Sequence, residues 1–196
     1  TEIKSNFGTI EKVRLPKNLD EIAFYTLPQL HALIKSKKIT SLELTKLYIK
    51  RLKQHNSSLF CVINLTEDLA LKQAKRADSL LKNGIILGPL HGIPYGLKDL
   101  ISVEGYPTTW GAYPYKNQRI NKTATIAREL ERSGAVLVAK LVSGSLARGD
   151  VWFGGMTRNP WDPKQGASGS SAGSGSATAA GLVGFSIGTE TLGSVS

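Results

Sequence analysis

The chain has 196 residues, of which 41% are hydrophobic and 20% are charged. This is enough for one compact domain with a sizeable core, and it excludes a disordered tail. The longest apolar runs are far shorter than a bilayer span, so we expect no membrane-spanning segment. The single cysteine, Cys61, excludes an internal disulfide framework and a cysteine-rich zinc site.

Basic residues exceed acidic residues by 25 − 15 = 10, and the excess is concentrated in the first half of the chain. A basic face of this kind is usually a solvated helix surface, although it is also compatible with nucleic acid. No RNA-binding or helix-turn-helix motif accompanies it, so we do not expect a nucleic-acid partner. No signal sequence follows Thr1, and because Thr1 is not methionine we expect a processed or trimmed N-terminus. The compartment stays open.

The first half of the chain alternates helical and strand patterns. Residues 27–37 are predicted to be helical, and Thr40 with Glu43 predicts a capping box for the next helix. The apolar stripe of that next helix consists of Leu44, Leu47, Tyr48 and Leu52. The elements that follow are a strand at 60–65, a helix at 67–82 that Asn83-Gly84 ends, and a strand at 95–101.

The second half continues the alternation and predicts an α/β layered fold without internal repeats. The pattern predicts a helix at 123–133 and a strand at 135–139, and then a loop rich in glycine, proline and tryptophan at 149–169. Small residues at 171–181 suit a helix packed closely on a sheet, and a strand is predicted at 182–187.

The sequence lacks the motifs of several known kinds of catalytic site. No His-Glu-x-x-His motif, cysteine pair or phosphate-binding glycine loop occurs, so we expect neither a metal nor another cofactor. The run Gly169–Gly173 formally fits the nucleophile elbow of α/β-hydrolases. That elbow needs an apolar strand directly before it and a histidine after it. Neither is present, because the three histidines are His31, His55 and His91.

Serine chemistry without histidine makes lysine the natural base, provided that burial keeps the amine neutral. Lys98 fits this requirement because apolar and small residues flank it. A structural alternative stays open at this point, in which Lys98 pairs with Asp99 or lies exposed at an edge.

Two long motifs in the same order resemble the amidase signature family. Residues 88–94 leading to Lys98-Asp99 resemble the lysine segment of that family, and residues 169–194 resemble its glycine- and serine-rich signature. Residues 157–162 are similar to the segment that precedes the signature, so the resemblance runs from about residue 25 to the end. It implies a mixed central sheet flanked by helices, which is the amidase signature fold, incomplete in this chain.

The resemblance also implies the site and its chemistry. Ser194 is expected to be the nucleophile, Ser170 to relay the proton after a cis peptide bond, and Lys98 to be the base. Ser171 is expected either to support the site by hydrogen bonding or to cap the following helix. The oxyanion hole is expected to consist of the backbone N–H groups of Thr191, Leu192, Gly193 and Ser194.

Departures from the family pattern favour one kind of member. Leu192 stands where the family usually has glycine, Ser196 where it has arginine, and Ala172 where it has glycine. These differences favour an amide hydrolase similar to peptide amidases, with a peptide or small-molecule amide as its substrate. The alternatives are the A subunit of a tRNA-dependent amidotransferase and a catalytically silent binding subunit.

The expected domain organisation is an N-terminal extension at 1–24 followed by the N-terminal portion of a single amidase domain at 25–196. The sequence stops two residues after Ser194. We therefore expect the remaining C-terminal part of the same polypeptide as a partner, and expect residues 1–196 alone to be inactive. An oligomer is compatible with the sequence.

Overall fold

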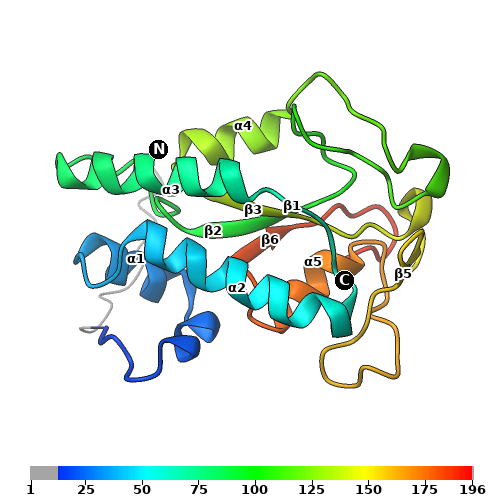
Figure 1. Cartoon of the computed structure of the whole chain (residues 1–196), viewed down its shortest axis with the longest axis horizontal. Coiled ribbons are helices and arrows are strands. Elements are labelled where there is room, and N and C mark those ends of the chain that lie inside the picture. The colour runs from blue at the N-terminus through cyan, green and yellow to red at the C-terminus, as the bar shows by residue number, and fades with distance from the viewer. Residues whose placement is uncertain (1–12, 196) are drawn as a thin grey trace, which may run out of the picture.

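The computed structural model describes residues 13–195 and contains a four-stranded mixed sheet (Figure 1). The strand order is β1-β3-β2-β6, with β1 at Val62–Leu65, β2 at Pro94–Lys98, β3 at Val136–Leu141 and β6 at Phe185–Ile187. Strand β2 is parallel to both β3 and β6, whereas β1 is antiparallel to β3. The mixed α/β sheet predicted from the sequence is confirmed.

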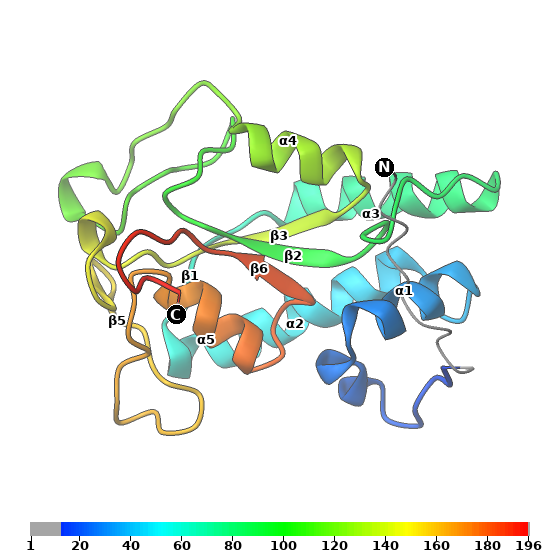
Figure 2. The same cartoon turned by 180° about the vertical axis from the view of Figure 1, so that it is seen from behind.

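Helices cover both faces of this sheet. In Figures 1 and 2, α3 and α4 lie on one side of it, and α1, α2 and α5 lie on the other. The five helices are α1 at Leu27–Lys35, α2 at Ser41–Leu59, α3 at Glu67–Lys82, α4 at Thr125–Arg132 and α5 at Ala172–Ala179. Apolar side chains between these layers form three buried clusters, and together they form the core.

Helix α2 begins as the sequence predicts. The Thr40 side chain accepts a hydrogen bond from the backbone of Glu43, and the Glu43 carboxylate accepts one from the Thr40 backbone, which completes the capping box. Leu44, Tyr48 and Leu52 are completely buried. The predicted stripe therefore anchors α2 in the core.

Helix α5 lies close to the sheet because it is built from small residues. A side chain at Gly173 would come within 2.2 Å of Val142 N and 2.4 Å of Cys61 O. Gly96 of β2 leaves comparable room for Leu141, whose Cδ1 would lie 2.2 Å from an added Cβ. The close approach at Gly173 places the start of α5 directly against the residues that flank β1 and β3.

Some element boundaries differ from the predicted ones. Strand β2 ends at Lys98 and not at residue 101, because the chain turns there: Ile101 N donates to Lys98 O and Asp99 enters a buried ion pair. Strand β6 begins at Phe185, three residues later than predicted, and β3 continues to Leu141. The loop predicted at 149–169 contains a short hairpin, with β4 at Val151–Trp152 and β5 at Gly155–Met156.

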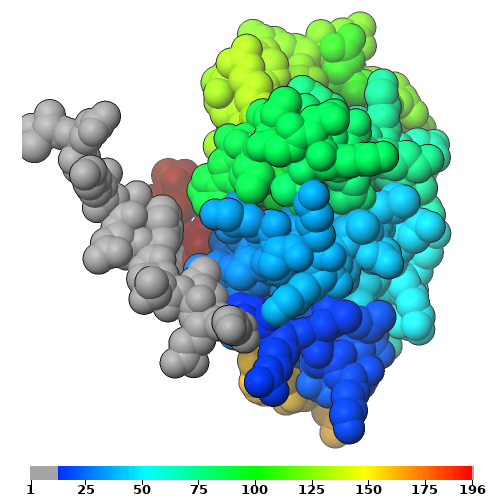
Figure 3. Space-filling view, turned by 90° about the vertical axis from the view of Figure 1, so that its left-hand side faces the viewer, coloured from blue at the N-terminus to red at the C-terminus, as the bar shows by residue number. Residues whose placement is uncertain are grey.

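Short 3-10 helices complete the described part of the chain, namely η1 at Leu19–Phe24, η2 at Tyr113–Tyr115 and η3 at Ser145–Ala147. Within η1, Ile22 and Ala23 are buried in the same cluster as Leu30 and Leu33 of α1. Figure 3 shows this end of the molecule, with the η1 segment in blue below the first helices. The predicted extension at 1–24 lies partly outside the described residues, so its boundary stays a prediction.

Within residues 13–195, no helix is both long enough and apolar enough to cross a membrane.

Candidate active site

The residues singled out in the sequence meet where parallel strands end. Lys98 is the last residue of β2, Ser170 and Ser171 come directly before α5, and residues 188–195 follow β6 (Figure 2). Carboxyl ends of parallel strands are a common position for ligand sites in α/β sheets. The fold therefore brings together three segments that lie about 20 to 90 residues apart in the sequence.

Lys98 is completely buried and its amine contacts three hydroxyl groups. Its Nζ lies 2.8 Å from Ser170 Oγ, 2.9 Å from Ser171 Oγ and 2.7 Å from Thr189 Oγ1. Burial lowers the pKa of Lys98 to about 8, while the negative charge of Glu190 acts in the opposite direction. A pKa of about 8 leaves about a tenth of the amine neutral at pH 7 and about half of it neutral at pH 8.

Ser170 connects this amine to Ser194. The Ser170 and Ser194 hydroxyl oxygens lie 3.0 Å apart, which extends the hydrogen-bonded chain from Lys98 to Ser194. The peptide bond between Gly169 and Ser170 is cis, as the resemblance implies. The structure thus places Lys98, Ser170 and Ser194 in one connected group.

Ser171 precedes the first residue of α5, but its side chain makes no capping hydrogen bond. Its Oγ instead donates to Thr189 O at 3.1 Å and accepts from Thr189 N at 3.2 Å and from Lys98. Of the two expectations for Ser171, the structure therefore agrees with hydrogen bonding at the site. Thr189 itself was not predicted, because nothing in the local sequence distinguishes it from its neighbours.

The expected oxyanion donors lie in the loop after β6. The N–H groups of Gly193 and Ser194 both donate to Glu190 Oε1, at 2.5 and 2.9 Å, and Val195 N donates to Glu190 Oε2 at 2.5 Å. The Leu192 side chain is 95% exposed. Glu190 thus organises this loop, and the oxyanion role of Thr191, Leu192, Gly193 and Ser194 stays a prediction.

A second buried lysine, Lys140, lies beside the site and is the ion-pair partner of Asp99. Lys140 Nζ lies 2.6 Å from Asp99 Oδ1, and both side chains are completely buried. Thr109 donates to the other oxygen, Asp99 Oδ2, through its backbone N–H and its hydroxyl. Asp99 therefore pairs with Lys140 and not with Lys98.

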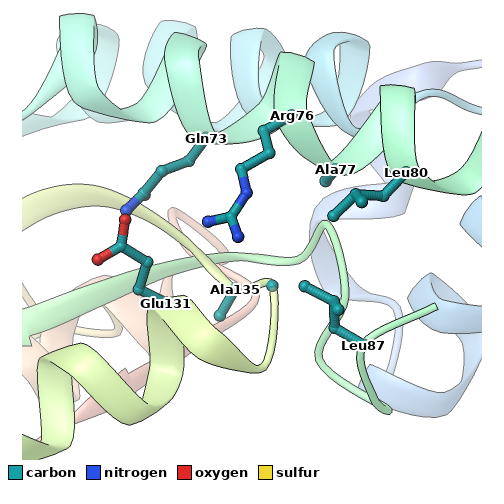
Figure 4. A pocket seen from close by; sticks show the side chains of 8 residues that line it. Gln73, Arg76, Ala77, Leu80, Leu87, Glu131 and Ala135 are labelled. Atoms are coloured by element: carbon teal, nitrogen blue, oxygen red, sulfur yellow. The ribbon is translucent and has the colours of Figure 1, made fainter. Parts of the chain in front are cut away.

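A hollow of about 570 Å³ borders these serines. It is lined by Ser168, Gly169, Ser171, Ser174, Ser194 and Val195, among others. A second hollow, between α3 and α4, is lined by Gln73, Arg76 and Glu131 (Figure 4). Its volume of about 10 Å³ accommodates little more than one water molecule. Only the first hollow adjoins the hydroxyl chain.

Comparison with known proteins agrees with this geometry. Residues 43–196 match the family model described as Amidase, and the chain belongs to that family. It is 37% identical over 180 residues to the A subunit of the Glutamyl-tRNA(Gln) amidotransferase of Chloroflexus aurantiacus, and the match covers 90% of this chain and 37% of the relative. The chain thus spans little more than a third of that relative's length.

Solved structures of a peptide amidase and of an amidase family protein also superpose on this chain. Native peptide amidase from Stenotrophomonas maltophilia superposes with a TM-score of 0.80 at 34% identity, covering 87% of this chain and 37% of that one. An amidase family protein from Bacillus anthracis superposes with a TM-score of 0.82 at 28% identity, covering 89% of this chain and 37% of that one. The family assignment made from the two sequence motifs is confirmed, and the class of protein is that of the amidase family.

Proposed function

We propose that this protein hydrolyses amide C–N bonds through a serine acyl-enzyme, with Ser194 as the nucleophile, Ser170 as the proton relay and Lys98 as the base. The observation that supports this proposal is the continuous hydrogen-bonded chain from Lys98 Nζ through Ser170 Oγ to Ser194 Oγ. A buried amine of lowered pKa at one end and a hydroxyl at the other are the two parts of an activated nucleophile.

The proposed proton relay requires a neutral Lys98 amine with its lone pair facing Ser170. The Ser171 hydroxyl donates its one proton to Thr189 O, so Ser171 accepts from Lys98. A neutral lysine amine has two N–H bonds and one lone pair. In the structure Lys98 Nζ donates to Ser170, Ser171 and Thr189, as an ammonium does, and Ser170 donates to Ser194. The proposed relay requires the neutral amine to turn its lone pair to Ser170, and the Ser170 hydroxyl to turn its proton from Ser194 to Lys98, while Ser171 and Thr189 accept the two remaining N–H bonds.

The proposed reaction then balances as acyl transfer. Lys98 takes the Ser170 proton while Ser170 takes the Ser194 proton, and Ser194 Oγ forms a bond to the carbonyl carbon of the amide. The C–N bond breaks when the relay returns a proton to the leaving nitrogen. Water, deprotonated by the same relay, releases the acid and restores Ser194.

The negative oxygen of the intermediate needs hydrogen-bond donors, each worth about 2.7–4 kcal/mol in the transition state. We assign this role to the backbone N–H groups of residues 191–194. In the present arrangement Gly193 N and Ser194 N donate to Glu190. The role therefore requires these two groups to exchange the Glu190 carboxylate for the substrate oxygen.

The substrate class that we propose is a peptide or small-molecule amide, as in the peptide amidase that the chain resembles in structure. The similarity to amidotransferase A subunits supports a second candidate, in which the protein acts on an amide within a multisubunit complex. A silent binding subunit is the third. Residues 25–196 would form the N-terminal portion of one amidase domain, completed by further chain in the full-length protein.

The deciding experiment incubates the full-length protein with peptide amides, fatty amides and aryl amides, and separately with a fluorophosphonate. We expect hydrolysis of at least one class and a covalent adduct that mass spectrometry places on Ser194. Ser194→Ala is expected to abolish both. An adduct on Ser171, or activity that persists in Ser194→Ala, would contradict the assignment. Amide transfer only in the presence of a copurified second subunit would favour the amidotransferase.

A further inference from the structure

The segment that contains Asp150 contacts the chain directly before Ser170. Asp150 Oδ2 accepts a hydrogen bond from Ser168 N at 3.1 Å. The same carboxylate packs directly on Gly166, where an added Cβ would lie 1.9 Å from Oδ2. Asp150 is half-buried, and the partner of its carboxylate is a backbone N–H. Its carboxylate therefore contacts the loop at two points, two and four residues before Ser170.

Two residues close to Asp150 in the sequence, Gly149 and Gly144, also contact the backbone at Gly169 and Ser170. The Gly149 carbonyl oxygen lies against two glycines, since a Cβ would be 2.0 Å from it at Gly169 and 1.8 Å from it at Gly144. Gly144 N donates to Ser170 O at 3.0 Å. The segment 144–150 thus contacts the backbone before Ser170 on one side and the Ser170 carbonyl on the other.

The conformation of Ser168 makes the Asp150 contact important. Ser168 has a φ of 59°, which is the left-handed region that residues with a side chain rarely adopt. Such a conformation persists only when the surrounding structure holds it. The Asp150 carboxylate is the side-chain acceptor for the Ser168 N–H, so it stabilises this conformation directly.

We propose that Asp150 is a positioning residue for Ser170: it holds the left-handed Ser168 and thereby keeps the Ser170 hydroxyl between Lys98 and Ser194. This inference rests on the proposed function, since it assigns Ser170 a part in the relay. In this proposal the acceptor position at Asp150, and not its charge, carries the effect, because the oxygen that accepts from Ser168 N also fills the space that the missing side chain of Gly166 leaves.

Three substitutions in the full-length protein test this. Asp150→Ala removes the acceptor, Asp150→Glu keeps the charge but moves it by one methylene, and Asp150→Asn keeps an oxygen in place without the charge. We expect kcat for amide hydrolysis to fall about tenfold to a hundredfold in the Ala and Glu variants, with a smaller change in KM. We expect Asp150→Asn to stay near the wild-type rate.

Asp162→Ala is the matched control. Asp162 is half-buried in the same loop and accepts a backbone hydrogen bond from Lys164 at 3.1 Å, but it does not contact residues 166–170 through any hydrogen bond of the described chain. Its kcat is expected to stay within about twofold of wild type. Thermal unfolding of every variant is followed in parallel. If Asp150→Ala does not fold, the Glu and Asn variants decide the question.

The possible outcomes separate this inference from the proposed function. Wild-type protein that neither hydrolyses amides nor reacts with fluorophosphonate would overturn the proposed function. An active wild type with Asp150→Glu as active as Asp162→Ala would overturn the positioning role. A loss in Asp150→Asn equal to that in Asp150→Glu would overturn it as well, because the charge would then carry the effect.

Discussion

Lys98 and Lys140 are both completely buried at the ends of neighbouring strands, yet their partners are of different kinds. Lys140 lies 2.6 Å from the carboxylate of Asp99, whereas the hydrogen bonds of Lys98 go to three hydroxyl groups. In the register of β2 with β3, Lys140 is opposite Leu97 and Lys98 is opposite Leu141, so the two side chains point to opposite faces of the sheet. One lysine is thus held as half of an ion pair, and the other is the one to which we assign proton transfer.

Replacing Lys98 by methionine is expected to remove the base while filling most of its volume. General-base catalysis contributes about 10²- to 10⁴-fold to a rate, so we expect kcat for amide hydrolysis to fall by that factor in Lys98→Met. Steady-state kinetics on the full-length protein measure the change, and circular dichroism shows whether the fold is kept. A folded Lys98→Met variant with near wild-type turnover would refute the role of Lys98.

The pH dependence of the reaction is expected to follow the protonation of Lys98. Since burial lowers the pKa of Lys98 to about 8, kcat/KM should rise as the pH increases through about 8 and the amine loses its proton. Glu190 raises this pKa, so Glu190→Gln is expected to shift the rise to lower pH. Glutamine keeps one oxygen acceptor, which can serve Gly193 N and Ser194 N, but it loses the second acceptor that Val195 N uses. A shift of the rise to higher pH in Glu190→Gln would contradict the electrostatic assignment.

Thr189 is expected to orient the Lys98 amine. Thr189→Val has nearly the same shape but removes the hydroxyl that lies 2.7 Å from Lys98 Nζ. A lost hydrogen bond to a charged or reacting group is worth about 1.5–3 kcal/mol, so we expect kcat to fall about tenfold to a hundredfold. Thr189→Ser restores the hydroxyl and is expected to recover most of the rate. Equal rates in the Val and Ser variants would show that the hydroxyl has no such part.

The ion pair of Lys140 is expected to matter for stability. Lys140→Met leaves the Asp99 carboxylate buried without its ammonium, which costs about 3–5 kcal/mol. Lys98→Met should cost less free energy of unfolding, because the hydroxyls that it leaves behind also hydrogen bond to one another and to the backbone. Chemical denaturation of both variants measures the difference. Equal destabilisation would contradict this distinction between the two lysines.

Much of this architecture could be predicted from short-range sequence patterns. The Thr40–Glu43 capping box and the apolar stripe of α2 involve residues three or four apart, so the local sequence determines them. The bounds of α3 were predicted to the residue, because Asn83-Gly84 ends the helix. Lys98 lies in one motif, and Ser170 and Ser194 lie in the other. Each motif is a continuous stretch of sequence, so both could be recognised without the structure.

The contacts that give these residues their environment could not be predicted in this way. The Lys98–Thr189 hydrogen bond joins residues 91 apart, and the Asp99–Lys140 pair joins residues 41 apart. Sequence reasoning left Asp99 as a candidate partner of Lys98, since the two are adjacent. The structure decides otherwise: Lys98, the last residue of β2, contacts Ser170 before α5, whereas Asp99, after the strand, contacts Thr109 and Lys140.

The sequence by itself therefore determined the family, the helices with strong local signals and the identity of the lysine and serines in the hydroxyl chain. Only the tertiary structure decided that Ser171 hydrogen bonds to Lys98 and Thr189 instead of capping α5, and that Asp150 accepts a hydrogen bond from Ser168 N. The physical reason is the separation along the sequence of the residues that determine each feature. Capping and helical periodicity depend on neighbours within one turn, whereas the surroundings of a buried side chain depend on how distant strands and loops pack together.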